Sequence, residues 1–237
     1  RDCNFFDKSE KIIQIFHNDI KKYYSNSEIF NIFKSNKRIL LFLIEQKLMV
    51  MDEYIVKKII QRKYVKFYYP QYFLPEILPF KDKKWLQESF SDDLPKELIE
   101  EIKKGELPVN FYNNRKIGEN DNLICKFIRE DSVQEFIAYV NRHNTPLNSE
   151  ISPSIYETNP FLIKNLLESK EDSKLTLIKY AAFFGSIQIV QYLQMNNVKL
   201  TPSLWLFAIH GKNNEMIHRL EDNHINPMIF YNDGDVD

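Results

Sequence analysis

The stretch LTLIKYAAFFGSIQIVQYLQ, residues 175–194, decides the fold. Two apolar segments, 177–182 and 187–193, are separated by Gly185 and Ser186, and apolar residues recur in each at intervals of three or four. This pattern predicts two short helices joined by a tight turn. A pair of this size cannot bury its apolar stripe alone, so we expect similar pairs to stack on either side of it.

The sequence repeats this pattern at a spacing of 27 residues. At this spacing four residues recur, Leu177, Ala181, Leu193 and Asn196 aligning with Leu204, Ala208, Leu220 and Asn223. At twice the spacing, residues 186–190 align with residues 132–136, inside ICKFIREDSVQEFIAYVN, so another unit begins near Asn122. A segment opening at Asn159 aligns at the single spacing and predicts a degenerate unit. We therefore expect about four units in residues 120–228, between an N-terminal helical region (1–119) and a tail (229–237).

Composition favours an all-α fold. Of the 237 residues, 43% are hydrophobic and only five are glycine, which is too few for a fold rich in tight hairpins. The net charge of -1 provides no overall field that would attract nucleic acid or anionic lipid. The longest apolar stretch, 39–51, contains Glu45 and Lys47 and is too short to span a bilayer. We expect an intracellular, cytoplasmic protein without a membrane span.

The N-terminal region predicts further short helices. The first, residues 9–24, has an apolar stripe that we expect to face the core, formed by Ile12, Ile13, Phe16 and Ile20. Residues 38–47 are apolar nearly all round, which predicts a helix buried between neighbours. Asp52 is the expected N-cap of the next helix.

Residues 63–85, KYVKFYYPQYFLPEILPFKDKKW, contain eight aromatic residues and three prolines. Two interpretations are open. Aromatic rings interleaved with lysines can stack on the bases of single-stranded nucleic acid. Alternatively, the prolines force an extended crossover, and its rings pack as a wedge that joins the N-terminal helices to the repeats. The neutral net charge and the absence of glycine favour the wedge.

The sequence contains no motif for catalysis or for a cofactor. Glycine-rich phosphate loops, H-E-x-x-H and G-x-S-x-G are all absent. His210, His218 and His224 are spaced by eight and six residues, which does not suit a metal site on one helix face. We therefore predict no catalytic residues, no cofactor, no metal and no small-molecule substrate. An enzyme without a recognisable motif is a remote alternative.

Residues 176–193, TLIKYAAFFGSIQIVQYL, resemble the ankyrin signature, in which T-P-L-H-x-A-A is followed by glycine and an I-V-x-x-L-L helix. Together with EYIVKKII, YPQYF and GENDNLICKFIREDSVQEFI, they make residues 38–227 similar to an uncharacterised family (a domain of unknown function) of divergent ankyrin-repeat proteins expanded in trichomonad-type parasitic protists. The resemblance implies an α-solenoid of short antiparallel helix pairs that binds other proteins, with no known activity.

The chain departs from the ankyrin pattern in two ways. Leu177 and Lys179 stand where proline and histidine are expected, so we expect the threonine–histidine hydrogen bonds of the standard repeat to be absent. The spacing of 27 residues is shorter than the usual repeat of about 33. Because the missing residues come from the β-hairpin finger, we expect fingers that are reduced to loops or absent.

The resemblance places a partner-binding ridge at the concave edge of the repeats, between the alanine pair and the glycine. In the central unit these positions are Phe183 and Phe184. The equivalent positions at spacings of 27 and 54 residues are Arg129, Glu130, Tyr156, Glu157 and His210. In the competing interpretation, the two phenylalanines pack against the next unit. The predicted function is a scaffold or adaptor of the ankyrin type that binds an unknown protein; the alternative is single-stranded nucleic-acid binding through residues 63–85.

Overall fold

The computed structural model describes residues 3–61, 68–88, 96–166 and 174–227. In these ranges the regular secondary structure is helical, apart from an isolated antiparallel bridge between Glu150 and Thr176. The all-α prediction is therefore confirmed. The described residues divide into two compact units: a C-terminal unit of residues 122–152 and 174–227, and an N-terminal unit of residues 3–121 and 153–166.

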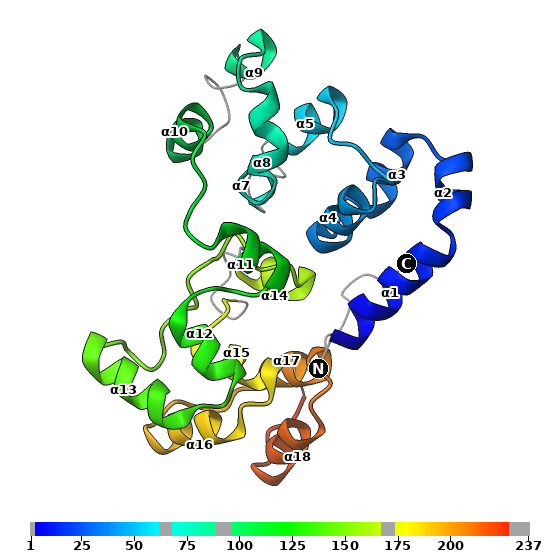
Figure 1. The fold of residues 1–237 in the computed structure, drawn as a ribbon. Helices are drawn as coiled ribbons and strands as arrows, with labels where there is room; N and C mark the ends of the chain where they lie inside the picture. The colour runs from blue at the N-terminus through cyan, green and yellow to red at the C-terminus, as the bar shows by residue number, and fades with distance from the viewer. Residues whose placement is uncertain (1–2, 62–67, 89–95, 167–173, 228–237) are drawn as a thin grey trace, which may run out of the picture. The chain divides into compact units, whose positions relative to one another are not determined.

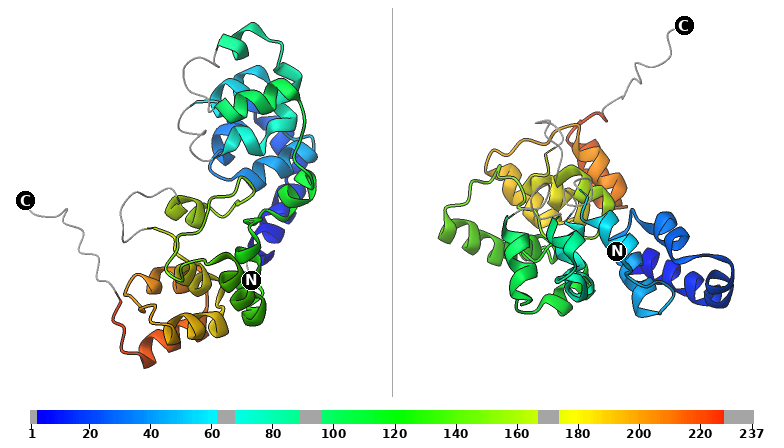
Figure 2. Two further views of the ribbon diagram at one scale, coloured as in Figure 1. Left: turned by 90° about the vertical axis from the view of Figure 1, so that its left-hand side faces the viewer. Right: turned by 90° about the horizontal axis from the view of Figure 1, so that it is seen from above.

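Helix pairs build the C-terminal unit. The pairs are α12 (Leu123–Arg129) with α13 (Val133–His143), α15 (Leu177–Phe184) with α16 (Ile187–Met195), and α17 (Leu204–His210) with α18 (Asn214–Asp222). Among the first helices, α12 packs against α15 and α15 against α17; among the second helices, α13 packs against α16 (Figures 1 and 2). Consecutive pairs of this unit therefore stack side by side.

The backbone of these pairs follows the spacing read from the sequence. The first helices begin at Leu123, Leu177 and Leu204, and the second helices begin 10 residues after each of these starts. Each turn contains one residue in the left-handed region, with φ values of 50°, 68° and 53° at Asp131, Gly185 and Lys212. The next residue of each turn donates its N–H to the carbonyl five residues earlier, at Phe127, Ala181 and Ala208 respectively. The three turns are therefore structurally equivalent.

Close approach of neighbouring pairs explains the small residues near the turns. The side chains from Leu177 to Phe183 are all buried, because α15 lies between α12 and α17 and is backed by α16. A Cβ atom at Gly211 would lie only 1.9 Å from the carbonyl oxygen of Phe183. Any side chain at this position would push the last two pairs apart.

The segment predicted as a degenerate unit has a different place. It forms α14 (Pro160–Leu166) and belongs to the N-terminal unit, together with residues 153–159. Since α12 packs directly against α15, neighbouring pairs are here separated by 54 residues. Within the described part of residues 120–228, three stacked pairs are present instead of the four predicted units.

Short helices also build the N-terminal unit. They are α1 (Cys3–Ile15), α2 (His17–Tyr23), α3 (Asn26–Phe33), α4 (Lys37–Glu45), α5 (Glu53–Ile59), α7 (Tyr69–Tyr72), α8 (Leu74–Ile77), the 3-10 helix η1 (Leu78–Phe80), α9 (Lys84–Glu88), α10 (Lys96–Lys104), α11 (Phe111–Ile117) and α14. As predicted, α4 is buried on nearly every side, and the Asp52 carboxylate accepts the N–H of Ile55 at the start of α5. The stripe predicted for the first helix is partly wrong. Ile13 is buried, but Ile12 and Phe16 are exposed.

Residues 68–88 are helical, although an extended crossover was one expectation. Pro70, Pro75 and Pro79 each lie in the first turn of a short helix, where the fixed φ of proline fits and its missing N–H leaves no bond unmade. The rings of Tyr72 and Phe73 are fully buried in the N-terminal core and meet edge to face at 5.0 Å. Residues 62–67 of the aromatic stretch lie outside the described residues.

Replacing Ala181 or Ala208 by leucine should destabilise the C-terminal unit by about 1–3 kcal/mol, because both side chains are fully buried between neighbouring helices and have no room to grow. Thermal and urea unfolding measure the effect. Ala138→Leu is the matched control, because Ala138 is exposed on α13. Equal stability of all three variants would contradict the close packing described here.

Candidate functional site

The turns of the three helix pairs line one edge of the C-terminal unit. We call residues 129–132, 183–186 and 210–213 the turn edge. Its first two turns are joined by hydrogen bonds: Ser186 Oγ donates to the Ile128 carbonyl, and the Asp131 carboxylate accepts the N–H groups of Gln188 and Ile189 at 3.1 and 3.0 Å. The second and third turns touch at Gly211 and Phe183. The turn edge is therefore a continuous, internally bonded surface.

Five of the predicted ridge residues belong to this edge, and four of them have exposed or half-buried side chains. Glu130 and His210 are exposed, whereas Arg129 and Phe184 are half-buried. Arg129 Nη1 donates to the Tyr180 hydroxyl at 2.9 Å, and the Phe184 ring lies 4.7 Å from the Tyr180 ring. The sequence analysis missed Tyr180, which links the two half-buried side chains and is itself buried.

The other three predicted ridge residues are buried, so they cannot offer exposed contacts. Phe183 is only 6% exposed, because it lies on the middle helix of the stack, as the competing interpretation proposed. Tyr156 and Glu157 belong to the N-terminal unit. The Tyr156 ring packs against Phe111 at 5.7 Å. The predicted ridge is therefore reduced to the four accessible side chains of the turn edge, Arg129, Glu130, Phe184 and His210.

Residues 153–159 carry a second concentration of polar contacts, in the N-terminal unit. Ser154 Oγ donates to Asp121 at 2.7 Å, and Thr158 Oγ1 donates to the Gly118 carbonyl at 2.8 Å. Lys37 Nζ donates to the Ile155 carbonyl at 3.0 Å, although the two residues are 118 positions apart in the chain. These bonds hold the segment onto the N-terminal helices.

Lys37 is the most deeply buried cation among the described residues, at 1% exposure. Burial lowers its pKa to about 7 from the ordinary lysine value of 10.5, and the nearby Glu157 carboxylate opposes this shift. Its ammonium lies 4.9 Å from the centre of the Tyr72 ring. An amine with this pKa changes charge near neutral pH. The contacts of Lys37 described here are all with other protein groups.

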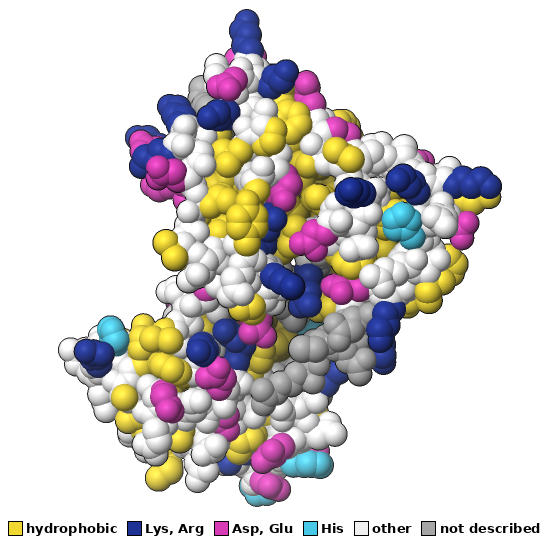
Figure 3. Space-filling model, in the orientation of Figure 1, with side chains coloured by type: hydrophobic (Ala, Val, Ile, Leu, Met, Phe, Trp, Pro, Cys, Tyr) yellow, Lys and Arg dark blue, Asp and Glu magenta, His cyan; other side chains and the backbone are white. Residues whose placement is uncertain are grey.

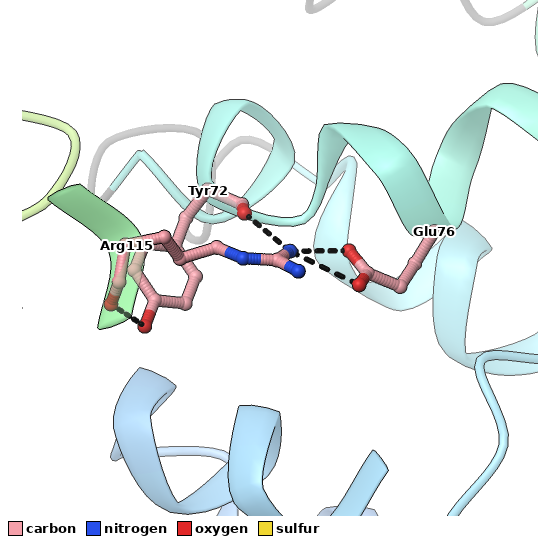
Figure 4. Close-up of polar contacts among 3 residues, drawn as sticks. All are labelled: Tyr72, Glu76 and Arg115. Atoms are coloured by element: carbon pink, nitrogen blue, oxygen red, sulfur yellow. Dashed lines mark hydrogen bonds and ion pairs between the residues drawn. The ribbon is translucent and has the colours of Figure 1, made fainter. Parts of the chain in front are cut away.

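A largely buried ion pair between Arg115 and Glu76 lies beside Tyr72 (Figure 4). Arg115 Nη1 donates to both carboxylate oxygens of Glu76, at 2.7 and 3.0 Å, and to the Tyr72 carbonyl at 3.2 Å. The Tyr72 hydroxyl donates in return to the Arg115 carbonyl at 3.3 Å. Burial raises the pKa of that hydroxyl well above its ordinary value. The arrangement joins α11 to α7 and α8, and its polar groups point at protein atoms, which is typical of a structural cluster.

Neither a metal-ligand cluster nor a membrane-spanning helix occurs among the described residues. In these ranges no three histidine, cysteine, aspartate or glutamate side chains come together as metal ligands would. None of the helices described combines the length and the apolar character needed to cross a membrane.

Comparisons with known proteins add no identification. No protein-family model matches the chain, and neither curated proteins nor solved structures match it. The resemblance to divergent ankyrin-repeat proteins therefore stays a prediction.

The Lys37 pKa predicts a pH-dependent stability of the N-terminal unit. Between pH 7 and 10.5 the unfolded chain binds a proton at this lysine that the folded chain does not. The free energy of unfolding should therefore rise with pH in this window, by up to about 1.4 kcal/mol per unit, and this contribution is absent below pH 7. Lys37→Met should remove that component of the slope.

Urea unfolding at several pH values, followed by Trp85 fluorescence in a Trp205→Phe background, reports on the N-terminal unit. Lys103→Met is the control, because Lys103 is exposed on α10 and its loss should leave the slope unchanged. Identical slopes for Lys37→Met and the parent protein would contradict the assignment.

Proposed function

We propose that the protein is a non-enzymatic interaction module in which the C-terminal unit, an ankyrin-like stack of helix pairs, binds another protein through the turn edge. The observation that carries this proposal is the side-by-side placement of three equivalent turns. They bring Arg129, Phe184 and His210, which are far apart in the sequence, to one edge. Stacked repeats commonly offer such composite surfaces to partners.

The side chains of the turn edge suit protein recognition. Phe184 is half-buried and supported from below by the rings of Tyr180 and Phe183, at 4.7 and 5.0 Å. The bond to Tyr180 holds the Arg129 guanidinium in place, so little side-chain entropy would be lost when a partner binds. Aromatic residues and arginine are enriched at energetically important interface positions, and the exposed Glu130 and His210 form a polar rim.

The ankyrin-like part of the proposal has further support at the start of α15. Thr176 makes no side-chain capping bond, and Lys179 donates instead to the Lys174 carbonyl at 2.9 Å. In the described residues, the loops before α15 meet at the bridge between Glu150 and Thr176 and at the ion pair between Lys174 and Glu150, and no hairpin is present in these ranges. These features match a repeat that lacks both the threonine–histidine arrangement and the projecting finger.

The nucleic-acid alternative, as read from residues 63–85, loses three of its eight aromatic residues. Tyr69, Tyr72 and Phe73 are buried in the N-terminal core, so their rings are not accessible to bases. Protein binding through the turn edge therefore has the better support.

The test is photo-cross-linking in a lysate of the source cells, with p-benzoylphenylalanine placed at position 184 or 210 and, as a control, at position 195. Met195 is 76% exposed at the end of α16, away from the turns. We expect the same protein to be cross-linked from positions 184 and 210 and not from 195. His210→Glu should weaken its capture, whereas Met195→Glu should not.

Circular dichroism verifies that each variant is folded. Capture of the same proteins from all three positions, or equal capture by both glutamate variants, would show that the turn edge is not the binding surface.

A further inference from the structure

Lysine side chains gather on the N-terminal unit where α5 meets the turn before α9. We call this surface the lysine patch; it comprises Tyr54, Lys57, Lys58, Lys81, Lys83, Lys84 and Trp85. All five lysines are exposed or half-buried. The surface over α9, at the top of Figure 3, shows lysine side chains next to hydrophobic ones.

Aromatic rings are built into the lysine patch. The Lys57 ammonium lies 4.9 Å from the centre of the Trp85 ring, which joins α5 to α9. The Lys58 ammonium lies 5.5 Å from the Tyr54 ring, one turn away on the same helix. Tyr54 is 45% exposed and Trp85 is half-buried. Two accessible rings therefore each have a cation beside them.

The local charge is positive, although the whole chain is nearly neutral. Three carboxylates accompany the five lysines: Glu53, Asp82 and Glu88. Glu53 is 2.6 Å from Lys57, and Glu88 is 3.6 Å from Lys84. These are exposed pairs between residues four apart on one helix, which are worth little and readily exchange for contacts to another anion. The lysine patch thus keeps a net excess of cations.

We propose that the lysine patch binds single-stranded nucleic acid, with the lysines contacting phosphates and the rings of Trp85 and Tyr54 stacking on bases. Such sites combine a cationic surface with accessible aromatic faces, and the stacking does not depend on base sequence. In this arrangement the half-exposed Lys57 ammonium moves from the Trp85 ring to a phosphate as a base stacks on the ring. The proposal is independent of the turn edge, which lies in the other unit.

A lipid surface fits the lysine patch less well. Proteins that lie on membranes insert exposed aliphatic or aromatic side chains into the acyl boundary. The large hydrophobic residues at the lysine patch are Trp85 and Phe80, which are both half-buried, and Tyr54, whose hydroxyl is polar. Rings with adjacent ammonium groups favour bases and phosphates over acyl chains.

Fluorescence anisotropy with a labelled single-stranded oligonucleotide tests the proposal on the full chain. We expect binding in the micromolar range at low salt that weakens as salt rises. In the double variant Lys81→Gln, Lys83→Gln the slope of log Kobs against log salt should become shallower by about 1.4, since each phosphate contact to a single strand contributes about 0.7. In a Trp205→Phe background, Trp85 is the only tryptophan, and its fluorescence should be quenched as the oligonucleotide binds.

The matched control is Lys21→Gln, Lys22→Gln on α2. It makes the same change in net charge in the same unit, and Lys22 also lies 4.9 Å from an exposed ring, that of Tyr23. This control should bind like the parent protein. No binding at low salt, an equal loss in both double variants, an unchanged Trp85 signal, or binding to anionic vesicles without binding to the oligonucleotide would each overturn the proposal.

Discussion

The burial of α15 on every side is the constraint on which the C-terminal unit depends. A helix of eight residues is too short to be stable alone, so its stability comes from the contacts with α12, α16 and α17. Those contacts require backbones to approach closely, which explains the alanines of α15 and the glycine that faces the Phe183 carbonyl. Because each pair buries the next, the stability of this unit is shared between neighbours, and no pair in it is an independent domain.

The same dependence explains how much of the fold could be predicted from the sequence. The start of α15, the turn at Gly185 and the cap at Asp52 are local features, and the structure has them where the sequence indicated. The first predicted helix, residues 9–24, is instead two helices, α1 and α2. The placement of residues 153–166 could not be predicted, because it is decided by bonds between distant residues. Lys37 and Ile155 are one example, and Gly118 and Thr158 are another. Aligning the sequence with itself detects the apolar spacing of α14. It does not show against which unit those apolar residues pack.

The candidate site shows the same limit at the level of single side chains. Phe183 and Phe184 are adjacent, so they point in directions about 100° apart on a helix, and only one of them can face the turn edge. The sequence does not tell which, because α15 is apolar nearly all round. The structure decides this by packing α17, the first helix of the third pair, against α15, where Gly211 lies against the Phe183 backbone. Tyr180 was overlooked for a related reason: its hydroxyl matters only because Arg129, from a helix 51 residues away, reaches it.

In residues 63–85, the composition suggests a surface of aromatic residues and lysines, but the fold places several of these residues elsewhere. Their aromatic residues and lysines suggested one mixed surface, but the chain separates them, since Tyr72 and Phe73 turn into the core while Lys81, Lys83 and Lys84 stay outside. Trp85, the last residue of the stretch, keeps some exposed surface and meets Lys57 of α5, and on the same helix Lys58 lies beside Tyr54. Burying Tyr72 and Phe73 stabilises the N-terminal core, whereas Tyr54 and Trp85, whose amphipathic rings tolerate both water and a stacked partner, keep exposed surface. Tyrosine occurs in both places, so the tertiary fold and not the residue type decides which rings stay accessible. The tertiary fold also brings Lys57 to Trp85, whereas the pairing of Lys58 with Tyr54 is local to α5.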